Sequence, residues 1–230
     1  MSFSGANDLG QLGIVGTGDK NEPYAVDTSV ALNLKQIKSI SAGEKHVLAL
    51  DANGISYSWG NNAEGQLGAN NAALPSNQNP ALVYDGDFVT GQKLIMVSGG
   101  LKHSLALNNL GRVFAWGRNL EGQLGLPQTT TSAIKPTDIS TPSVLNTFRI
   151  IQVSAGYYHS LFLTEGGAVY ATGGNSCGCV GDGTATARFA PQVVPASAPT
   201  DVLNGKFIAK VLAGYDYSIA LDADGNMYCL

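Results

Sequence analysis

The sequence predicts an all-β fold, a β-propeller made of four-stranded antiparallel blades, because two segments recur in step along the chain. A glycine-led segment at residues 59–68 returns at 116–125, and shorter copies stand at 5–13 and 173–181. A second segment at residues 41–50 returns at 98–107, 154–163 and 212–221. Both recur every 55–58 residues, and a fixed period of this length is typical of radial or stacked modules.

Each module is predicted to contain four short strands, three of which follow one another in its second half and are joined by tight turns. Residues 38–42 alternate in polarity, residues 46–50 form a compact apolar run, and residues 55–59 alternate again. The turn between the last two contains Asn53 and Gly54, a pair that tolerates positive φ. Glycine also ends the equivalent turns at 108–111, 164–167 and 222–225, so the pattern predicts consecutive antiparallel hairpins.

A polar stretch of variable length follows the glycine-led segment. Residues 69–80 and 127–142 are polar and contain proline, which predicts surface loops. A short fourth strand at residues 81–84 or 192–195 is then expected to lead into the next module.

The residues that recur in both segments are expected to be structural. The glycines allow turns and close approach between blades, the leucines pack between blades, and the asparagines bond loop backbone that would otherwise be buried unpaired. The histidines are interpreted as buried, hydrogen-bonded structural residues. These residues are Gly60, Asn62, Gly65, Leu67, Gly68, Gly117, Asn119, Gly122, Leu124, Gly125, His46, His103 and His159.

Composition excludes several classes of function. The net charge is −4 and no run of basic residues exists, which argues against nucleic acid and anionic membrane surfaces as partners. No apolar stretch reaches the ~18 residues of a membrane span. The opening of the chain lacks the features of a signal peptide, so a cytoplasmic or nuclear location is expected.

No catalytic, metal or cofactor site is predicted. The three histidines occupy equivalent positions that a propeller could bring around one channel, but Tyr217 replaces histidine in the fourth copy. Cys177 and Cys179 have no second Cys or His pair at a metal-binding spacing, and the odd cysteine count makes a disulfide framework a poor interpretation. Serine follows histidine in two copies, but adjacent strand residues point to opposite faces, so no Ser/His/Asp arrangement is implied.

Together, the two segments resemble the repeat of the regulator of chromosome condensation family over essentially the whole chain. The resemblance implies a propeller that usually has seven blades. The four repeats, at approximately 5–59, 60–116, 117–172 and 173–230, are therefore interpreted as one segment, 1–230, that forms an arc of a larger propeller. A closed four-bladed ring and completion by a second chain remain alternatives. In a closed ring, residues 1–4 and 227–230 would compete for one strand position, since both align with 113–116.

By the same resemblance, the two positions before each histidine lie on the working face of the propeller. Family members include exchange factors, photoreceptors and scaffolds. No tryptophan stands at these positions, which argues against photoreception, and tyrosines are favoured in protein contact surfaces. The candidate partner-binding residues are Glu44, Lys45, Leu101, Lys102, Tyr157, Tyr158, Tyr215 and Asp216.

The sequence therefore favours a non-catalytic protein–protein interaction scaffold over an enzyme. The expected partner is a protein, and the remaining blades of the same protein are a second kind of partner. The alternative hypothesis is a guanine-nucleotide exchange factor for a Ran-like small GTPase, for which only Glu44 offers a comparable charge on the face. Chromatin binding is disfavoured by the acidic balance of the chain.

Overall fold

The computed structural model describes residues 2–71, 73–84, 92–141, 143–195 and 202–230, which form five antiparallel sheets. Three sheets have four strands, one has three and one has two. We call them, in chain order, the amino-terminal hairpin and blades 1 to 4. The hairpin contains β1 (Ser2–Gly5) and β2 (Lys20–Ala25); blade 1 contains β3 (Ile37–Ala42), β4 (His46–Asp51), β5 (Ser56–Asn61) and β6 (Ser76–Leu82).

The later blades repeat this order of strands. One short 3₁₀ helix, η1 (Val144–Thr147), stands between blades 2 and 3. Blade 2 contains β7 (Leu94–Gly99), β8 (His103–Asn108), β9 (Val113–Arg118) and β10 (Ser132–Asp138); blade 3 contains β11 (Ile150–Ala155), β12 (His159–Thr164), β13 (Val169–Gly173) and β14 (Arg188–Val193); blade 4 contains β15 (Ile208–Ala213), β16 (Ser218–Asp222) and β17 (Met227–Cys229).

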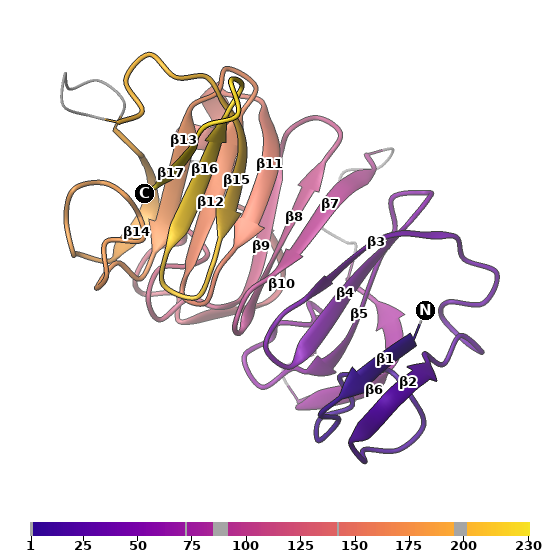
Figure 1. Cartoon of the computed structure of the whole chain (residues 1–230). Coiled ribbons are helices and arrows are strands. Elements are labelled where there is room, and N and C mark those ends of the chain that lie inside the picture. Colours follow the sequence, from indigo (N-terminus) through magenta and orange to yellow (C-terminus); the bar gives the residue numbers. More distant parts are fainter. Residues whose placement is uncertain (1, 72, 85–91, 142, 196–201) are drawn as a thin grey trace.

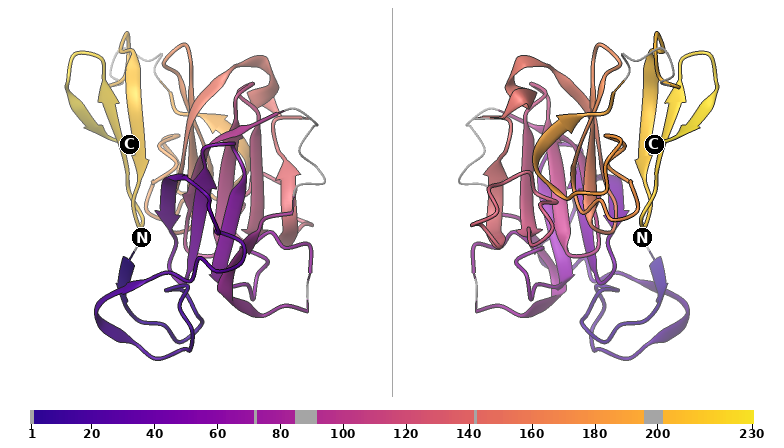
Figure 2. Two further views of the ribbon diagram at one scale, coloured as in Figure 1. Left: turned by 90° about the vertical axis from the view of Figure 1, so that its right-hand side faces the viewer. Right: turned by 90° about the vertical axis from the view of Figure 1, so that its left-hand side faces the viewer.

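The sheets stand side by side in a curved, open row. Figure 1 shows the hairpin and blade 4 at opposite ends of the row. After a quarter turn, both ends lie on one side and the middle blades on the other, so the row forms an arc (Figure 2). The first strands of adjacent blades contact one another along the inside of this arc. The all-β propeller architecture is confirmed, and the sheets do not close into a ring.

Strand pairing within each blade follows the expected hairpins. In blade 1, Val47 on β4 lies opposite Trp59 on β5 and Ala42 on β3. The sequence repeats begin inside the third strand of a sheet, so each four-stranded blade is formed from two consecutive repeats.

The fourth strand differs from the expectation. It was expected at residues 81–84 and 192–195, but β6 begins earlier, inside the polar stretch 69–80 interpreted as loop, and β14 already begins at Arg188. The equivalent β10 also lies within a stretch interpreted as loop, of which Pro142 is outside the described residues. A proline recurs inside the fourth strand, at positions 23, 80, 136 and 191, and edge strands tolerate proline because one side of the strand needs no hydrogen bonds.

The hydrophobic core lies between blades, in separate clusters. Between blades 1 and 2, Leu48 and Leu50 pack with Val97 and the fully buried Trp116. Similar clusters join the hairpin to blade 1, blade 2 to blade 3 and blade 3 to blade 4. Each blade therefore buries its apolar faces against its neighbours, as a repeat architecture requires.

The glycine-led segments are tight turns closed by asparagine. In blade 2, Asn119 Oδ1 accepts a hydrogen bond of 2.9 Å from Leu124 N, and its Nδ2 donates to Thr130 O at 2.7 Å. Asn7, Asn62 and Asn175 accept the same backbone bond in the other copies. The turn begins at a glycine with positive φ, and a Cβ at Gly60 would meet the Lys45 carbonyl oxygen at 2.4 Å.

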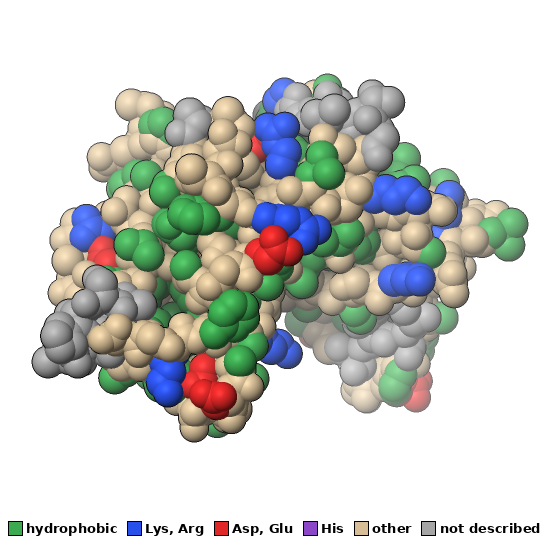
Figure 3. Space-filling view, turned by 90° about the horizontal axis from the view of Figure 1, so that it is seen from above, with side chains coloured by type: hydrophobic (Ala, Val, Ile, Leu, Met, Phe, Trp, Pro, Cys, Tyr) green, Lys and Arg blue, Asp and Glu red, His purple; other side chains and the backbone are tan. Residues whose placement is uncertain are grey.

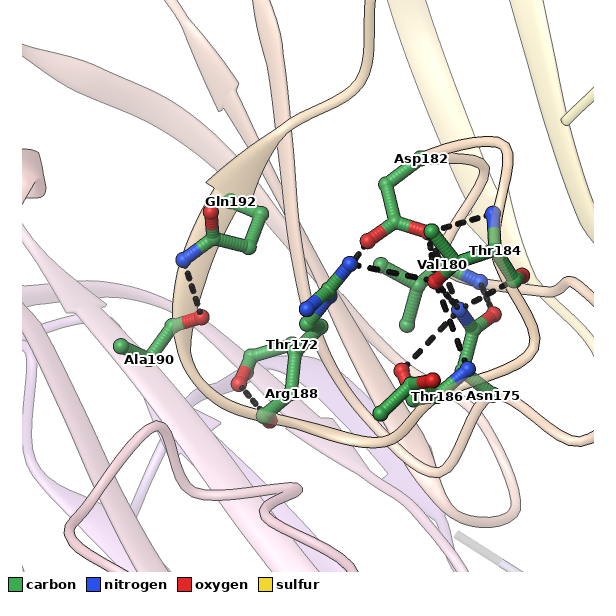
Figure 4. A network of polar contacts seen from close by, with 9 residues as sticks. All are labelled: Thr172, Asn175, Val180, Asp182, Thr184, Thr186, Arg188, Ala190 and Gln192. Atoms are coloured by element: carbon green, nitrogen blue, oxygen red, sulfur yellow. Dashed lines mark hydrogen bonds and ion pairs between the residues drawn. The ribbon is translucent and has the colours of Figure 1, made fainter.

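In the fourth copy, this turn is also bound to the outer strand of its blade. Figure 4 shows Asn175 Nδ2 near Asp182, Thr184 and Thr186, with 2.9 Å to Thr184 O. Asp182 also forms an ion pair with Arg188 at the start of β14. The side chain of Arg188 is therefore held at the outer edge of blade 3.

Candidate functional site

Four short loops between the first and second strands of the blades gather at one end of the arc. These loops cover residues 43–45, 100–102, 156–158 and 214–217. Each is bound to the next by its backbone: Glu44 N donates to Gly100 O at 3.3 Å, Leu101 N to Gly156 O at 3.3 Å, and Tyr157 N to Gly214 O at 3.1 Å. They surround a cavity of about 290 Å³. The repeated bonds hold the loops as one rigid surface.

We call the surface of these loops the axial face, and the eight predicted partner-binding residues all belong to the loops. Glu44, Tyr215 and Asp216 are exposed, and Lys45, Lys102, Tyr157 and Tyr158 are partly buried. Leu101 differs, because its side chain is only 6% exposed and lines the central cavity. It lies beneath the axial face and does not project from it.

Three tyrosines of the axial face form an aromatic cluster. The rings of Tyr157 and Tyr215 stack with their centroids 3.7 Å apart, and Tyr158 meets Tyr157 edge-on at 4.7 Å. Hydrogen bonding with Tyr215 raises the pKa of Tyr157 to about 12, so the phenol stays neutral at physiological pH. The cluster joins the loops of blades 3 and 4 and leaves Tyr215 56% exposed.

Two of the basic side chains near the face are already paired. Lys45 Nζ lies 2.7 Å from Asp8 Oδ2 in the amino-terminal hairpin, and this contact raises the pKa of Lys45. Arg118 binds Glu121 with 2.6 Å between Nη2 and Oε1, and its guanidinium lies 6.0 Å from the centre of the Tyr158 ring. The charges on this side of the arc therefore fix the blades to one another as well as facing solvent.

Beneath the axial face, each histidine binds a serine of the next blade. His46 Nε2 is 3.0 Å from Ser104 Oγ, His103 Nε2 is 3.0 Å from Ser160 Oγ, and His159 Nε2 is 2.8 Å from Ser218 Oγ. The hydroxyl of Ser104 donates to Gln66 O at 2.8 Å, so its oxygen accepts the proton of His46 Nε2. The unprotonated Nδ1 of each histidine faces the protein without a hydrogen-bond partner.

Burial keeps these histidines neutral. It lowers the pKa of His46 and His159 to about 4 and that of His103 to about 3. A serine whose proton goes to a backbone carbonyl, next to a ring that donates to it, is not activated as a nucleophile. The three pairs are structural links between blades.

Other reactive groups do not form a site within the described residues. Burial raises the pKa of the Cys179 thiol to about 11, and its sulfur lies 3.0 Å from Gly174 O. In the described ranges, no group of three or more His, Cys, Asp and Glu residues could hold a metal ion. No helix in that part of the chain is long and apolar enough to cross a bilayer.

The opposite end of the sheets has a different character. Figure 3 views the molecule from above Figure 1, where the hairpin turns lie, and shows charged and apolar side chains interspersed. Arg149 pairs with Glu165 at 3.0 Å, and Leu110 is 57% exposed. A larger cavity of about 500 Å³ lies at the outer edge of blades 2 and 3, lined mainly by apolar residues such as Ile139 and Phe189.

The chain is similar to a known domain family and to several known proteins. The RCC1-like domain matches residues 1–230. The human probable E3 ubiquitin-protein ligase HERC6 is 37% identical over 193 residues, which cover 84% of this chain and 18% of that protein. The ultraviolet-B receptor UVR8 of Arabidopsis thaliana is 28% identical over 224 residues, or 97% of this chain and 47% of the receptor. The chain thus spans less than half the length of either relative.

Solved structures show the same fold. Human WBSCR16 superposes with a TM-score of 0.80 at 22% identity, covering 95% of this chain and 52% of that structure. Prp20p from Saccharomyces cerevisiae, described with its binding properties to Gsp1p and histones, has a TM-score of 0.78 at 25% identity, covering 98% and 52%.

Proposed function

The chain belongs to the RCC1-like domain family, and from that membership we propose that it is a non-catalytic scaffold that binds a partner protein through its axial face. Proteins with the same fold can differ in what their loops bind. The proposal therefore rests on the residues of the axial face and not on the fold. The expected partner is a protein because the net charge is −4 and no basic stripe suits a nucleic acid.

The observation that carries this proposal is the aromatic cluster of Tyr157, Tyr158 and Tyr215 on interlocked loops. Stacked tyrosines lose little conformational entropy on binding and offer both apolar area and hydroxyl groups, which is why tyrosine is enriched in protein interfaces. The backbone bonds between loops hold these rings in place before a partner arrives. Glu44 and Asp216 add exposed charge for orientation at the edge of the cluster.

The lack of catalytic function is proposed on the chemistry of the described residues. Each serine that pairs with a histidine donates its own proton to a backbone carbonyl, and each of the three histidines has a pKa of about 4 or lower. No nucleophile with an adjacent base is therefore available on the axial face or beneath it.

We propose that further blades cover the first strand of blade 1, which the amino-terminal hairpin leaves exposed. On blades 2, 3 and 4, the equivalent residues Val97, Val153 and Val211 are at most 5% exposed because the preceding blade covers them. Ile40 on β3 is 50% exposed at the same position. An uncovered apolar sheet face favours pairing with another sheet.

A pair of matched double variants tests the binding face. Glu44→Arg with Tyr157→Ala changes the axial face, and Glu165→Arg with Leu110→Ala makes the same kinds of change at the opposite end. We expect the first to lose partner proteins that wild type and the second variant retain in affinity capture, with unchanged thermal melting. Equal retention by both variants would refute the axial face as the binding surface.

The second candidate is guanine-nucleotide exchange on a Ran-like small GTPase, raised by the similarity to Prp20p. Glu44 is an exposed carboxylate of the axial face and lines its cavity of about 290 Å³. Release of a fluorescent nucleotide from a purified Ran-like GTPase measures this directly. Acceleration at substoichiometric concentrations, lost in Glu44→Gln, would replace the scaffold with an exchange factor.

A further inference from the structure

A cavity of about 400 Å³ lies between blades 3 and 4, at the edge of the axial face. Its walls include Tyr158, Tyr215 and Asp216 of the face together with Glu121, Gly174 and Cys177 of the glycine-led turns. The volume lies in the range of small-ligand sites. Two carboxylates and two phenol rings are a combination suited to a cation.

The equivalent position one blade earlier, between blades 2 and 3, is occupied by an arginine side chain. There, Arg118 extends between blades 2 and 3. Its Nε lies 3.0 Å from Glu121 Oε2, its Nη1 lies 3.7 Å from Glu64 Oε1, and Tyr158 stands beside the guanidinium. The chain itself therefore holds a guanidinium between two carboxylates and an aromatic ring at this junction.

Between blades 3 and 4, the cavity lies at the position that corresponds to the guanidinium of Arg118. Repeat alignment places Gly174 at the position of Arg118, and Glu121, Cys177 and Asp216 at the positions of Glu64, Glu121 and Tyr158. All four of these residues line the cavity. Glycine removes the internal cation, while Asp216 adds a carboxylate.

No neighbouring cation of the described chain takes the vacant place. Arg188 is bound to Asp182 and Thr184 on the outer side of blade 3 (Figure 4). Arg118 is bound to Glu121 and Glu64. Among the described residues, Asp216 has no ion pair, so its charge remains available to a ligand.

We propose that this cavity, which we call the cation pocket, receives an arginine side chain projected by the partner protein. The guanidinium pairs with the carboxylate of Asp216 and lies against the rings of Tyr158 and Tyr215, while Glu121, which binds Arg118, forms part of the opposite wall. This assignment rests on the proposed protein-binding function, because the pocket shares three residues with the axial face. It makes the presence of an accessible arginine a requirement for the partner.

The test is an NMR titration of the full chain with acetyl-Gly-Arg-Gly-amide and with the same peptide containing citrulline, which keeps the shape and removes the charge. We expect shifts at the amides of the 174–177 and 214–216 segments and at least tenfold tighter binding of the arginine peptide. Asp216→Asn should weaken that binding about tenfold, and Asp224→Asn, an exposed carboxylate in the β16–β17 turn, should leave it unchanged.

A variant that restores the internal cation gives an independent measurement. Gly174 has no positive φ, and a Cβ there would lie 3.1 Å from Tyr158 Cβ, so a side chain needs only a small shift. Gly174→Arg should fill the pocket, abolish binding of the arginine peptide and melt at a higher temperature than Gly174→Gln. The glutamine variant has the same backbone change without the charge.

Equal binding of the arginine and citrulline peptides, or unchanged binding in Asp216→Asn, would overturn the proposal. Tighter binding of free L-arginine than of the peptide would overturn its assignment to a partner protein. Neither result depends on Glu44 or Tyr157, which lie outside the pocket. A partner lost from the Glu44 and Tyr157 double variant would therefore still support the scaffold if the cation pocket failed.

Discussion

Acidification from pH 7 to pH 5 should strongly destabilise the fold, because three buried histidines must stay neutral. His46, His103 and His159 each donate from Nε2 to a serine of the next blade, and burial lowers their pKa to about 4, 3 and 4. In the unfolded chain a histidine takes up a proton below about pH 6.5. Between about pH 6.5 and pH 4 the unfolded chain therefore binds more protons than the folded chain. This contribution to stability is complete above pH 6.5 and is lost as the pH is lowered through this range.

The size of this effect follows from the pKa difference. At pH 5 each histidine is mostly protonated when unfolded and neutral when folded, which costs about 2 kcal/mol relative to pH 7. Three histidines together cost about 6 kcal/mol, a large part of the 5–15 kcal/mol that stabilises a typical domain.

Urea denaturation at pH 7 and pH 5 measures the difference in the free energy of unfolding. Replacing His103 by Gln should reduce that difference by about 2 kcal/mol. Lys102→Gln, a change at the neighbouring position that leaves all three histidines in place, should not alter it. Equal stability at the two pH values, or a histidine NMR titration near pH 6.5 in the folded chain, would refute the buried neutral pairing.

Three further predictions follow from single contacts. Ser160→Ala leaves the Nε2 proton of His103 without an acceptor and should lower the free energy of unfolding by about 1–3 kcal/mol in urea denaturation. Gly60→Ala places a Cβ 2.4 Å from a carbonyl oxygen at φ 101° and should cost about 3 kcal/mol or more, while Gly166→Ala, with 3.8 Å of clearance, should stay within about 0.5 kcal/mol. In a thiol titration of the native chain, the two exposed cysteines should react quickly and Cys179 only after unfolding; fast reaction of all three thiols would show that the turn around Cys179 opens.

The hairpins could be predicted from the sequence because their signals are local. Apolar runs at strand length and a glycine at the end of each turn depend only on neighbouring residues, and β4 and β5 lie within two residues of their expected bounds. The fourth strand could not be placed from polarity, because an outer strand buries little. Its usable signal was the recurring proline at positions 23, 80, 136 and 191.

The contacts between blades could not be predicted from local sequence patterns. Serine follows histidine at 104 and 160, and its alternation along the strand correctly separates it from that histidine. The pairing partner is the histidine of the preceding blade, which becomes apparent only when the blades are placed side by side. The first copy has Val47 at this position, and the described amino-terminal hairpin offers no histidine to it.

The axial face was predicted as a set of positions, but its geometry was not. The structure brings Tyr157, Tyr158 and Tyr215 together and places Leu101 below the surface. The cation pocket depends on a difference between repeats, Arg118 in one and Gly174 in the next, whose meaning requires the contacts of the arginine.

Site-specific photo-crosslinking tests the binding face most directly. A photoreactive residue at Tyr215, which is 56% exposed on the axial face, is compared with one at Leu110, which is 57% exposed at the opposite end. A protein-interaction scaffold that uses the axial face should give a discrete crosslinked partner from position 215 and none from position 110. Crosslinks of equal yield from both positions, or a discrete partner from position 110 alone, would contradict it.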